Sequence, residues 1–154
     1  MPRSFMPVLM VAVGLAGSML ALPSAAQFAK AEDAIAYRKA GMTMMAAHFG
    51  RVAAMANGRI PLDAKALADN AELATILSKL PYAGFIPGTD QGDTKALPKI
   101  WTENDKFLAA AAKMQGEMAK LNVAAKSGNM DAIKAAVGAT GGACKACHDA
   151  YWKE

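Results

Sequence analysis

The chain has 154 residues, of which 54% are hydrophobic, and it carries a formal net charge of +4 at pH 7. That length suits a single domain, and the composition favours a compact helical core and excludes a disordered polymer. The Lys and Arg residues are scattered and form no basic run interleaved with aromatic residues, so no nucleic-acid partner is expected.

The N-terminal segment, up to residue 26, has the pattern of a secretory signal peptide. Arg3 gives a positively charged start, residues 8–22 are apolar, and the small residues 24–26 offer a cleavage site. A retained membrane anchor is the alternative, but a spanning helix needs about 20 apolar residues, and this stretch is shorter and ends at Pro23. We therefore expect cleavage after residue 26, a periplasmic location, no membrane attachment afterwards, and one mature domain over residues 27–154.

The mature chain predicts four helices and no strand. Between residues 31 and 56, and again between 63 and 79, apolar side chains recur at spacings of three and four, so each set lies on one helix face that should meet a core. Asn57-Gly58 marks the end of the first helix, and Asp63 is suited to cap the second. The first stripe comprises Ile35, Arg38, Met42, Met45, Phe49, Val52 and Ala56, and the second comprises Leu67, Leu73, Ile76, Leu77 and Leu80.

The segment from Pro81 to Pro98 interrupts regular structure, because prolines and glycines recur along it. A connection of this length is either an ordered cover with a function or a plain surface linker, and the sequence leaves both open. Two further helices are expected at residues 102–126 and 130–152, separated by Ser127-Gly128-Asn129.

The chemistry of the chain is concentrated in Cys144-Lys145-Ala146-Cys147-His148. On a helix, residues three and four apart share a face, so Cys144, Cys147 and His148 project to one side. Two thiols at this spacing can add to the two vinyl groups of haem while the adjacent imidazole reaches the iron, which is the signature of covalent c-type attachment. The motif therefore predicts one haem c.

Three other interpretations of the two cysteines are weaker. A disulfide between them would close a very short loop and stabilise the domain little. A thioredoxin-like pair would follow a strand, and no strand is predicted. A zinc site would lack ligands, because the chain has no further cysteine and its only other histidine is His48.

The behaviour of such a haem depends on the side chain above the other face of the iron. A methionine or histidine ligand gives a low-spin electron carrier, whereas an open position lets the iron take a small gas. His48 lies outside the apolar stripe of the first helix and is expected at the surface. Met42 and Met45 are better placed, but methionine on such a stripe usually fills the core, so ligation and packing both stay open.

With these features the mature chain resembles cytochrome c′ and the wider class II cytochromes c, whose attachment motif lies near the C-terminus. The resemblance implies an all-α, antiparallel four-helix bundle with up-down-up-down topology and covalently bound haem, for which cytochrome c′ is a standard example. Family members often form dimers through the first two helices, so a homodimer is expected. Besides residues 144–151, the matching stretches are Gln27-Phe28-Ala29-Lys30, Tyr37-Arg38, Ala47-His48-Phe49-Gly50-Arg51 and Pro87-Gly88-Thr89 with Gly92-Asp93.

The resemblance assigns the principal haem contacts. It makes Cys144 and Cys147 the thioether positions and His148 the proximal iron ligand. Arg38, with Lys39 beside it, matches a family residue close to the haem propionates, where a guanidinium can pair bidentately with a carboxylate.

Three further positions follow from the same resemblance. Thr89 and Asp93 match haem-edge contacts, and Met42 matches the distal residue above the iron. Many cytochromes c′ leave this residue unligated and have five-coordinate, high-spin iron, whereas low-spin relatives use a methionine of the same helix as sixth ligand. We favour the five-coordinate form, which binds NO or CO or transfers single electrons with a redox partner that the sequence does not identify. The low-spin carrier ligated by Met42 is the alternative.

The chain departs from the family pattern at one visible position. Four residues after the proximal histidine many members have arginine or lysine, whereas this chain has Trp152. At this spacing the indole lies over the same helical face as His148, and we expect it to shield the imidazole from water.

A haem enzyme, such as a peroxidase or a nitric oxide reductase, is the second alternative. It would need acid and base groups on the distal side to move protons. Met42, Met45 and Phe49 supply none, so we expect no catalytic activity.

Overall fold

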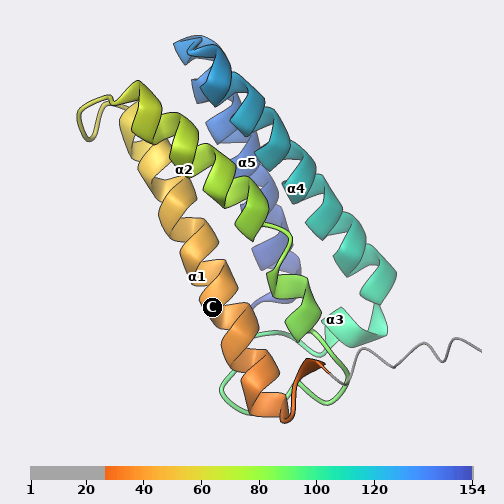
Figure 1. The fold of residues 1–154 in the computed structure, drawn as a ribbon. Helices are drawn as coiled ribbons and strands as arrows, with labels where there is room; N and C mark the ends of the chain where they lie inside the picture. The colour runs from red at the N-terminus through yellow and green to blue at the C-terminus, as the bar shows by residue number, and fades with distance from the viewer. Residues whose placement is uncertain (1–26, 154) are drawn as a thin grey trace, which may run out of the picture.

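The computed structural model describes residues 27–153, and the expected signal peptide lies outside them. The four long helices run alternately up and down and pack as an antiparallel bundle (Figure 1), which confirms the predicted fold class. No helix in this part of the chain is both long and apolar enough to cross a membrane. The elements are α1 (Ala31–Ala56), α2 (Ala64–Leu77), the 3-10 helix η2 (Pro81–Gly84), α3 (Lys99–Thr102), α4 (Asn104–Ser127) and α5 (Met130–Tyr151).

The helix ends follow from local signals in the sequence. The backbone N–H of Ala66 donates to the Asp63 carboxylate at 2.9 Å, so the predicted cap of α2 is confirmed. α4 stops at Gly128, whose φ of 70° is a left-handed conformation that glycine adopts without strain. The expected third helix is confirmed as α4, which begins two residues later than predicted. The backbone leaves the helical region at Glu103, and the turn before it forms the separate helix α3, which was not expected.

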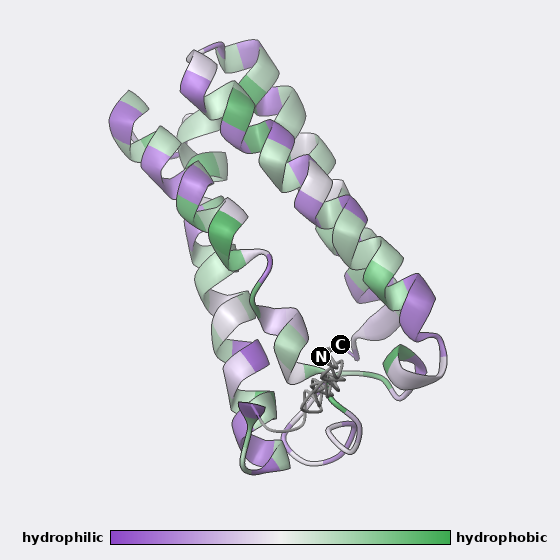
Figure 2. Cartoon of the chain, turned by 45° about the vertical axis from the view of Figure 1, so that its right-hand side comes forward, coloured by the Kyte–Doolittle hydropathy of each residue, from purple (hydrophilic) through white to green (hydrophobic). Residues whose placement is uncertain are grey.

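The core lies between the inward faces of the four long helices. Hydrophobic and hydrophilic residues alternate around each of them in Figure 2, as expected for helices that bury one face. α1 and α2 pack against each other, as do α4 and α5, and α2 also contacts α4. The larger buried cluster includes Met45, Val52, Leu67, Met114, Met118, Leu121, Ile133 and Val137.

The predicted apolar face of α2 is only half right. Leu67 and Leu77 are buried, but Leu73, Ile76 and Leu80 are exposed by 44%, 53% and 43%. The reason is that α2 packs through its alanines, which let the helices approach closely and which share a stripe with Leu67 and Leu77. The three exposed residues lie on the neighbouring stripe and point away from the core.

The long connection after α2 is an ordered cover at one end of the bundle. The buried guanidinium of Arg38 in α1 donates to the carbonyl oxygens of Gly84 and Thr89 and to the hydroxyls of Thr89 and Thr94, at 2.7–2.9 Å. Gly84 packs so closely on α1 that a Cβ there would lie 2.5 Å from the carbonyl oxygen of Ala34. These contacts press the connection onto α1 and build one wall of a cavity.

Candidate functional site

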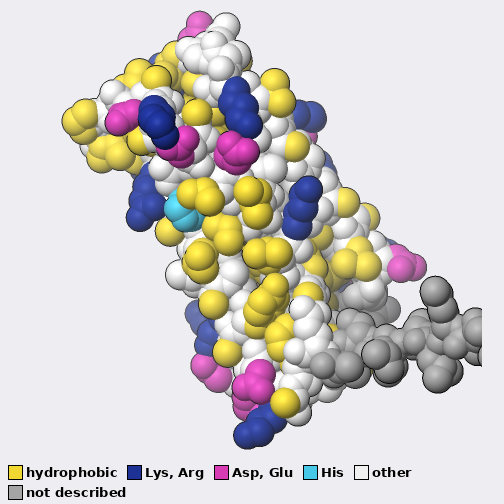
Figure 3. Space-filling view, in the orientation of Figure 1, with side chains coloured by type: hydrophobic (Ala, Val, Ile, Leu, Met, Phe, Trp, Pro, Cys, Tyr) yellow, Lys and Arg dark blue, Asp and Glu magenta, His cyan; other side chains and the backbone are white. Residues whose placement is uncertain are grey.

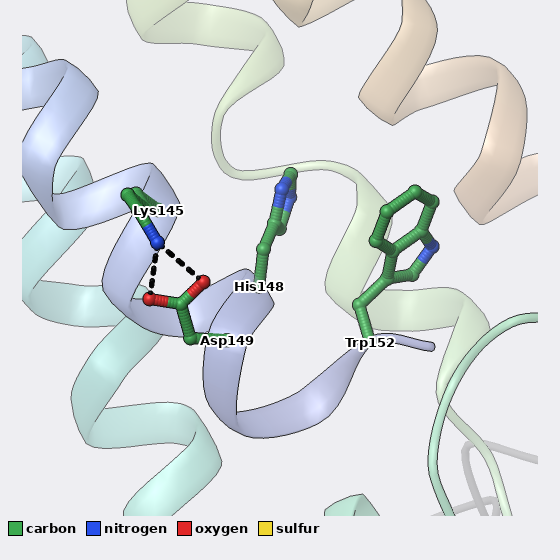
Figure 4. Close-up of a pocket in the computed structure, with 4 residues that line it drawn as sticks. All are labelled: Lys145, His148, Asp149 and Trp152. Atoms are coloured by element: carbon green, nitrogen blue, oxygen red, sulfur yellow. Dashed lines mark hydrogen bonds and ion pairs between the residues drawn. The ribbon is translucent and has the colours of Figure 1, made fainter. Parts of the chain in front are cut away.

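The last turns of α5 bring the three residues of the attachment motif to one side of the helix. Cys144 packs against the main core, whereas Cys147 packs against a second cluster formed by Ile100, Phe107 and Tyr151. The side chains of His148 and Trp152 project from the same face of α5 in Figure 4. The motif therefore faces the space between the end of α5, α1 and the long connection.

This space is a cavity of about 470 Å³, which falls in the range of small-molecule and cofactor sites. Its walls come from segments far apart in the sequence, and its lining is mostly apolar with a polar rim. The apolar and aromatic lining residues are Met42, Ala46, Phe85, Ala96, Ile100, Phe107, Cys147, Tyr151 and Trp152, and the polar ones are Arg38, Lys39, Thr43, Asp93, Thr94, Lys95 and His148.

The two cysteine thiols are free, and both are half-buried. Burial raises the pKa of the Cys144 thiol, and burial together with the nearby Cys144 raises that of Cys147. Thiol-disulfide catalysts instead depend on a lowered thiol pKa. The pair therefore lacks the lowered thiol pKa that is typical of thiol-disulfide catalysts.

The donor set of the cavity fits a haem held by two thioethers. Cys147 and His148 line the cavity, and the remaining wall offers a broad aromatic surface. Cys144 lies one turn before Cys147 on α5, where it packs against the main core and does not line the cavity. The basic side chain of Lys39 lies at the rim, where acidic substituents of a cofactor would meet water. Apolar walls that hold a ring system and polar groups at the edge are the usual design of such sites.

Arg38 lines the cavity, where the resemblance implies a contact with the haem propionates, and its guanidinium also binds the long connection. The residue is only 2% exposed, and four of its five N–H donors serve the long connection, through two carbonyls and two hydroxyls. Bidentate binding of a carboxylate needs two donors, and only the Nε–H is left. The structure thus gives Arg38 the task of holding the cover in place.

Thr89 and Asp93, the other two expected contacts in the connection, differ in position. Thr89 is completely buried behind Arg38 and does not line the cavity. Asp93 does line it and forms an exposed ion pair with Lys39. The Lys39 ammonium, by hydrogen bonding and by charge, lowers the pKa of the Asp93 carboxyl.

The structure separates the candidate residues of α1. Met42 lines the cavity on the opposite side from α5, whereas Met45 is buried in the main core. His48 is half-buried and its Nδ1 lies 2.8 Å from Oδ1 of Asn70 in α2, away from the cavity. Of the three side chains considered for the open face of an iron, only Met42 is in reach.

Trp152 lies beside His148, as the i+4 spacing predicted. The two rings are 5.5 Å apart with an interplanar angle of 35°. The indole is held in place because residues 95–97 pair with the end of α5: the N–H of Lys153 donates to the carbonyl of Lys95 at 2.8 Å, and Lys95 Nζ lies 4.7 Å from the centre of the indole ring.

A carboxylate also neighbours the imidazole along α5. Figure 4 shows Asp149 turned toward Lys145, and the two side chains form hydrogen bonds of 2.7 and 2.8 Å. The contact of His148 within this view is therefore with the indole of Trp152.

Several lining residues were not identified from the sequence. Phe85, Thr94 and Lys95 belong to the irregular connection, which carries no periodic signal. Phe107 and Ile100 flank the break between α3 and α4, and they reach the cavity only because that break turns the chain. Proximity across the bundle is the only property that links them to the motif.

Comparison with known proteins agrees with this geometry. The family model described as Cytochrome C' matches residues 33–152. Cytochrome c' of Rubrivivax gelatinosus is 53% identical over 126 residues, covering 81% of this chain and 98% of the relative. Its crystal structure superposes with a TM-score of 0.79, covering 82% of this chain and 100% of that one.

A second relative was solved with a gas bound. A nitric oxide complex of a variant of cytochrome c prime from Alcaligenes xylosoxidans is 44% identical, with a TM-score of 0.77 and coverage of 82% of this chain and 98% of that one. Another variant of the same protein was solved with carbon monoxide bound.

Proposed function

The chain belongs to the cytochrome c′ family, and from this membership we propose that it is a periplasmic haem protein that binds NO or CO and can pass single electrons. The observation that carries the proposal is a single cavity that joins Cys147 and His148 of α5 to the apolar side chain of Met42 in α1. Variants of a relative with this fold have been solved with nitric oxide bound and, separately, with carbon monoxide bound.

Cys144 and Cys147 would hold the haem by thioethers, and His148 would be the iron ligand. When bound, the haem supplies the one-electron centre and the coordination site for a gas. Lys39 is the residue we assign to the acidic edge of the cofactor, with Asp93 beside it, and Arg38 keeps the cover closed over the cavity. The aromatic side chains of the lining would exclude water from most of the site when the haem is bound.

Met42 decides whether the site is open to a gas. We propose that its thioether packs over the iron without ligating it, so that the iron is five-coordinate and high-spin. The side chains that α1 contributes beside it, Thr43 and Ala46, offer no imidazole or carboxylate for moving protons. That composition supports gas binding and electron transfer and gives no support to peroxidase or reductase chemistry.

Residues 1–26 would act as the export signal, and the mature protein would form a homodimer. Support for the dimer comes from the exposed side chains of Leu73 and Ile76 in α2, with Leu80 just beyond its end, together with Met44 of α1, which is 52% exposed. Figure 3 shows hydrophobic side chains gathered over the face formed by α1 and α2. A surface of this kind is typical of an interface between subunits.

Absorption spectra of the protein matured with haem test the proposal. We expect a covalently bound haem, a high-spin ferric spectrum and a ferrous spectrum that changes when carbon monoxide is added. A low-spin ferric spectrum with a sulfur-to-iron charge-transfer band would establish the alternative with Met42 as ligand. Haem that organic solvent extracts from the denatured protein would contradict attachment through Cys144 and Cys147. N-terminal sequencing of the secreted protein should begin at Gln27.

A further inference from the structure

Three lysines gather around the C-terminal end of α5, beside the cavity. Lys95 and Lys153 occupy opposite positions in the backbone pairing around the bridge between Ala96 and Trp152. The ammonium of Lys99 lies 5.5 Å from the centre of the Tyr151 ring. Lys95 therefore lies against Trp152, which contacts His148, while Lys153 follows Trp152 in the chain and Lys99 lies against the adjacent Tyr151.

These charges are not compensated by the residues that the structure describes. Lys39 and Lys145, which also lie near the cavity, are paired with Asp93 and Asp149. Within residues 27–153, Lys95, Lys99 and Lys153 form no ion pair. Lysines without an intramolecular partner are available to pair with a negatively charged surface.

Trp152 gives this cluster an aromatic centre. The side chain lines the cavity together with Lys95, contacts both His148 and Lys95, and is 43% exposed. Protein interfaces are commonly built in this way, with tryptophan among the residues that contribute most to binding and with charged residues at the rim. We call Trp152, Lys95, Lys99 and Lys153 the Trp152 surface.

We propose that the Trp152 surface docks an acidic electron-transfer protein. The inference rests on the proposed haem function, and it adds where the redox partner binds and which charge the partner's surface carries. The lysines select a negatively charged protein surface and steer it toward the site. Because the indole touches His148, a partner docked here lies against the iron ligand, and one electron passes from the reduced partner to the ferric protein without exchange of any atom.

The test compares two double variants of the haem-loaded protein. Lys95→Glu/Lys153→Glu reverses the two opposed charges of the Trp152 surface. Lys113→Glu/Lys134→Glu makes the same change of net charge at exposed lysines that form no ion pair within the described part of the chain. Lys134 is near the start of α5, about 21 Å along the helix axis from His148.

Each protein is reduced in a stopped-flow experiment by flavodoxin hydroquinone, an acidic protein, and separately by a small neutral hydroquinone. The readout is the ratio of the two rates, which removes any change in the reduction potential of the haem. At low ionic strength we expect this ratio to fall about tenfold or more in Lys95→Glu/Lys153→Glu and by less than about twofold in the control. The difference should shrink as salt screens the charges.

Equal ratios in the two variants, whether lowered or unchanged, would overturn the docking site, because only net charge would then matter. The milder Lys95→Gln/Lys153→Gln variant should give an intermediate ratio, and an unchanged ratio there would also count against the site. Spectra of the same samples keep this test separate from the proposed function. Missing covalent haem or missing carbon monoxide binding in the unsubstituted protein contradicts that function and not the position of the partner.

Discussion

A single buried guanidinium holds the cover of the cavity in place. Arg38 replaces water with four protein acceptors and also lies 4.5 Å from the ring centre of Phe85. Burial lowers the pKa of its guanidinium, which still remains charged because that pKa begins far above neutrality. A charge in this position is tolerated because four of its five N–H donors form hydrogen bonds with the protein.

Removing this side chain should therefore cost much more than removing a surface arginine. We expect Arg38→Ala to lower the free energy of unfolding by about 3 kcal/mol, since it leaves buried carbonyls without donors. The matched control is Arg51→Ala, because Arg51 is exposed and makes one long hydrogen bond of 3.4 Å to Asn70. Denaturation with guanidinium chloride, followed by circular dichroism, measures the free energy of unfolding of both variants. Equal losses of stability would contradict the anchoring role of Arg38.

Met42 determines whether the haem iron has an open position for a gas or a sixth ligand, as in a low-spin electron carrier. If its thioether only packs over the iron, Met42→Leu conserves volume and should leave the ferric spectrum unchanged, with carbon monoxide affinity altered by less than about tenfold. Met45→Leu, in the core, serves as control. A change of the ferric spectrum from low-spin to high-spin in Met42→Leu alone would show that the thioether was a ligand.

Trp152 should control what reaches the proximal side of the haem. Trp152→Phe keeps a ring next to His148 and should change little, whereas Trp152→Arg removes it and should alter the kinetics of NO or CO binding several-fold. Stopped-flow or flash photolysis measures the rates. If Trp152→Arg binds both gases at the original rates, the indole does not shield the imidazole.

At the scale of elements, the close approach of η2 to α1 requires glycine. A Cβ on Gly84 would lie 2.5 Å from the Ala34 carbonyl and 2.9 Å from Cβ of Arg38, so the two elements would have to separate. Gly84→Ala should therefore destabilise the protein by about 2 kcal/mol.

The control for that substitution is a glycine in open space. Gly116 lies within α4, and an added Cβ would meet no atom within 4 Å. Because alanine favours the helix over glycine, Gly116→Ala should stabilise by about 1 kcal/mol. Thermal unfolding of both variants shows whether each substitution raises or lowers the stability. If both variants lose stability, the clash at Gly84 is not the reason why Gly84→Ala is destabilised.

At the scale of the whole molecule, the exposed stripe of α2 should be covered by a second copy. Leu73→Glu/Ile76→Glu places charges on that stripe and should weaken a homodimer at least about 100-fold, because desolvating a carboxylate in an apolar interface is costly. Val123→Glu on α4 is the control, since Val123 is 71% exposed. Sedimentation velocity measures the effect, and a monomeric unsubstituted protein would contradict the expected dimer.

Much of the fold could be predicted because its signals are local. The periodicity of apolar residues gave the bounds of α1 as they are observed, and Asp63 and Gly128 marked helix ends through their own backbone preferences. The face of α2 could not be assigned in the same way. Whether Leu73 or Ala71 points inward depends on how closely two helices approach, and both choices fit a helical period.

By itself the sequence determined the helices, the family resemblance and the attachment motif, because Cys144, Cys147 and His148 are neighbours along one helix. The apolar periodicity left Met42 and Met45 open and the resemblance favoured Met42, which the tertiary structure places in the cavity while Met45 is buried in the core. Only the tertiary structure decided that the donors of Arg38 serve the cover, and that Lys95 meets the end of α5. These contacts join residues about fifty to a hundred positions apart, and no local property of the chain encodes the distance between them.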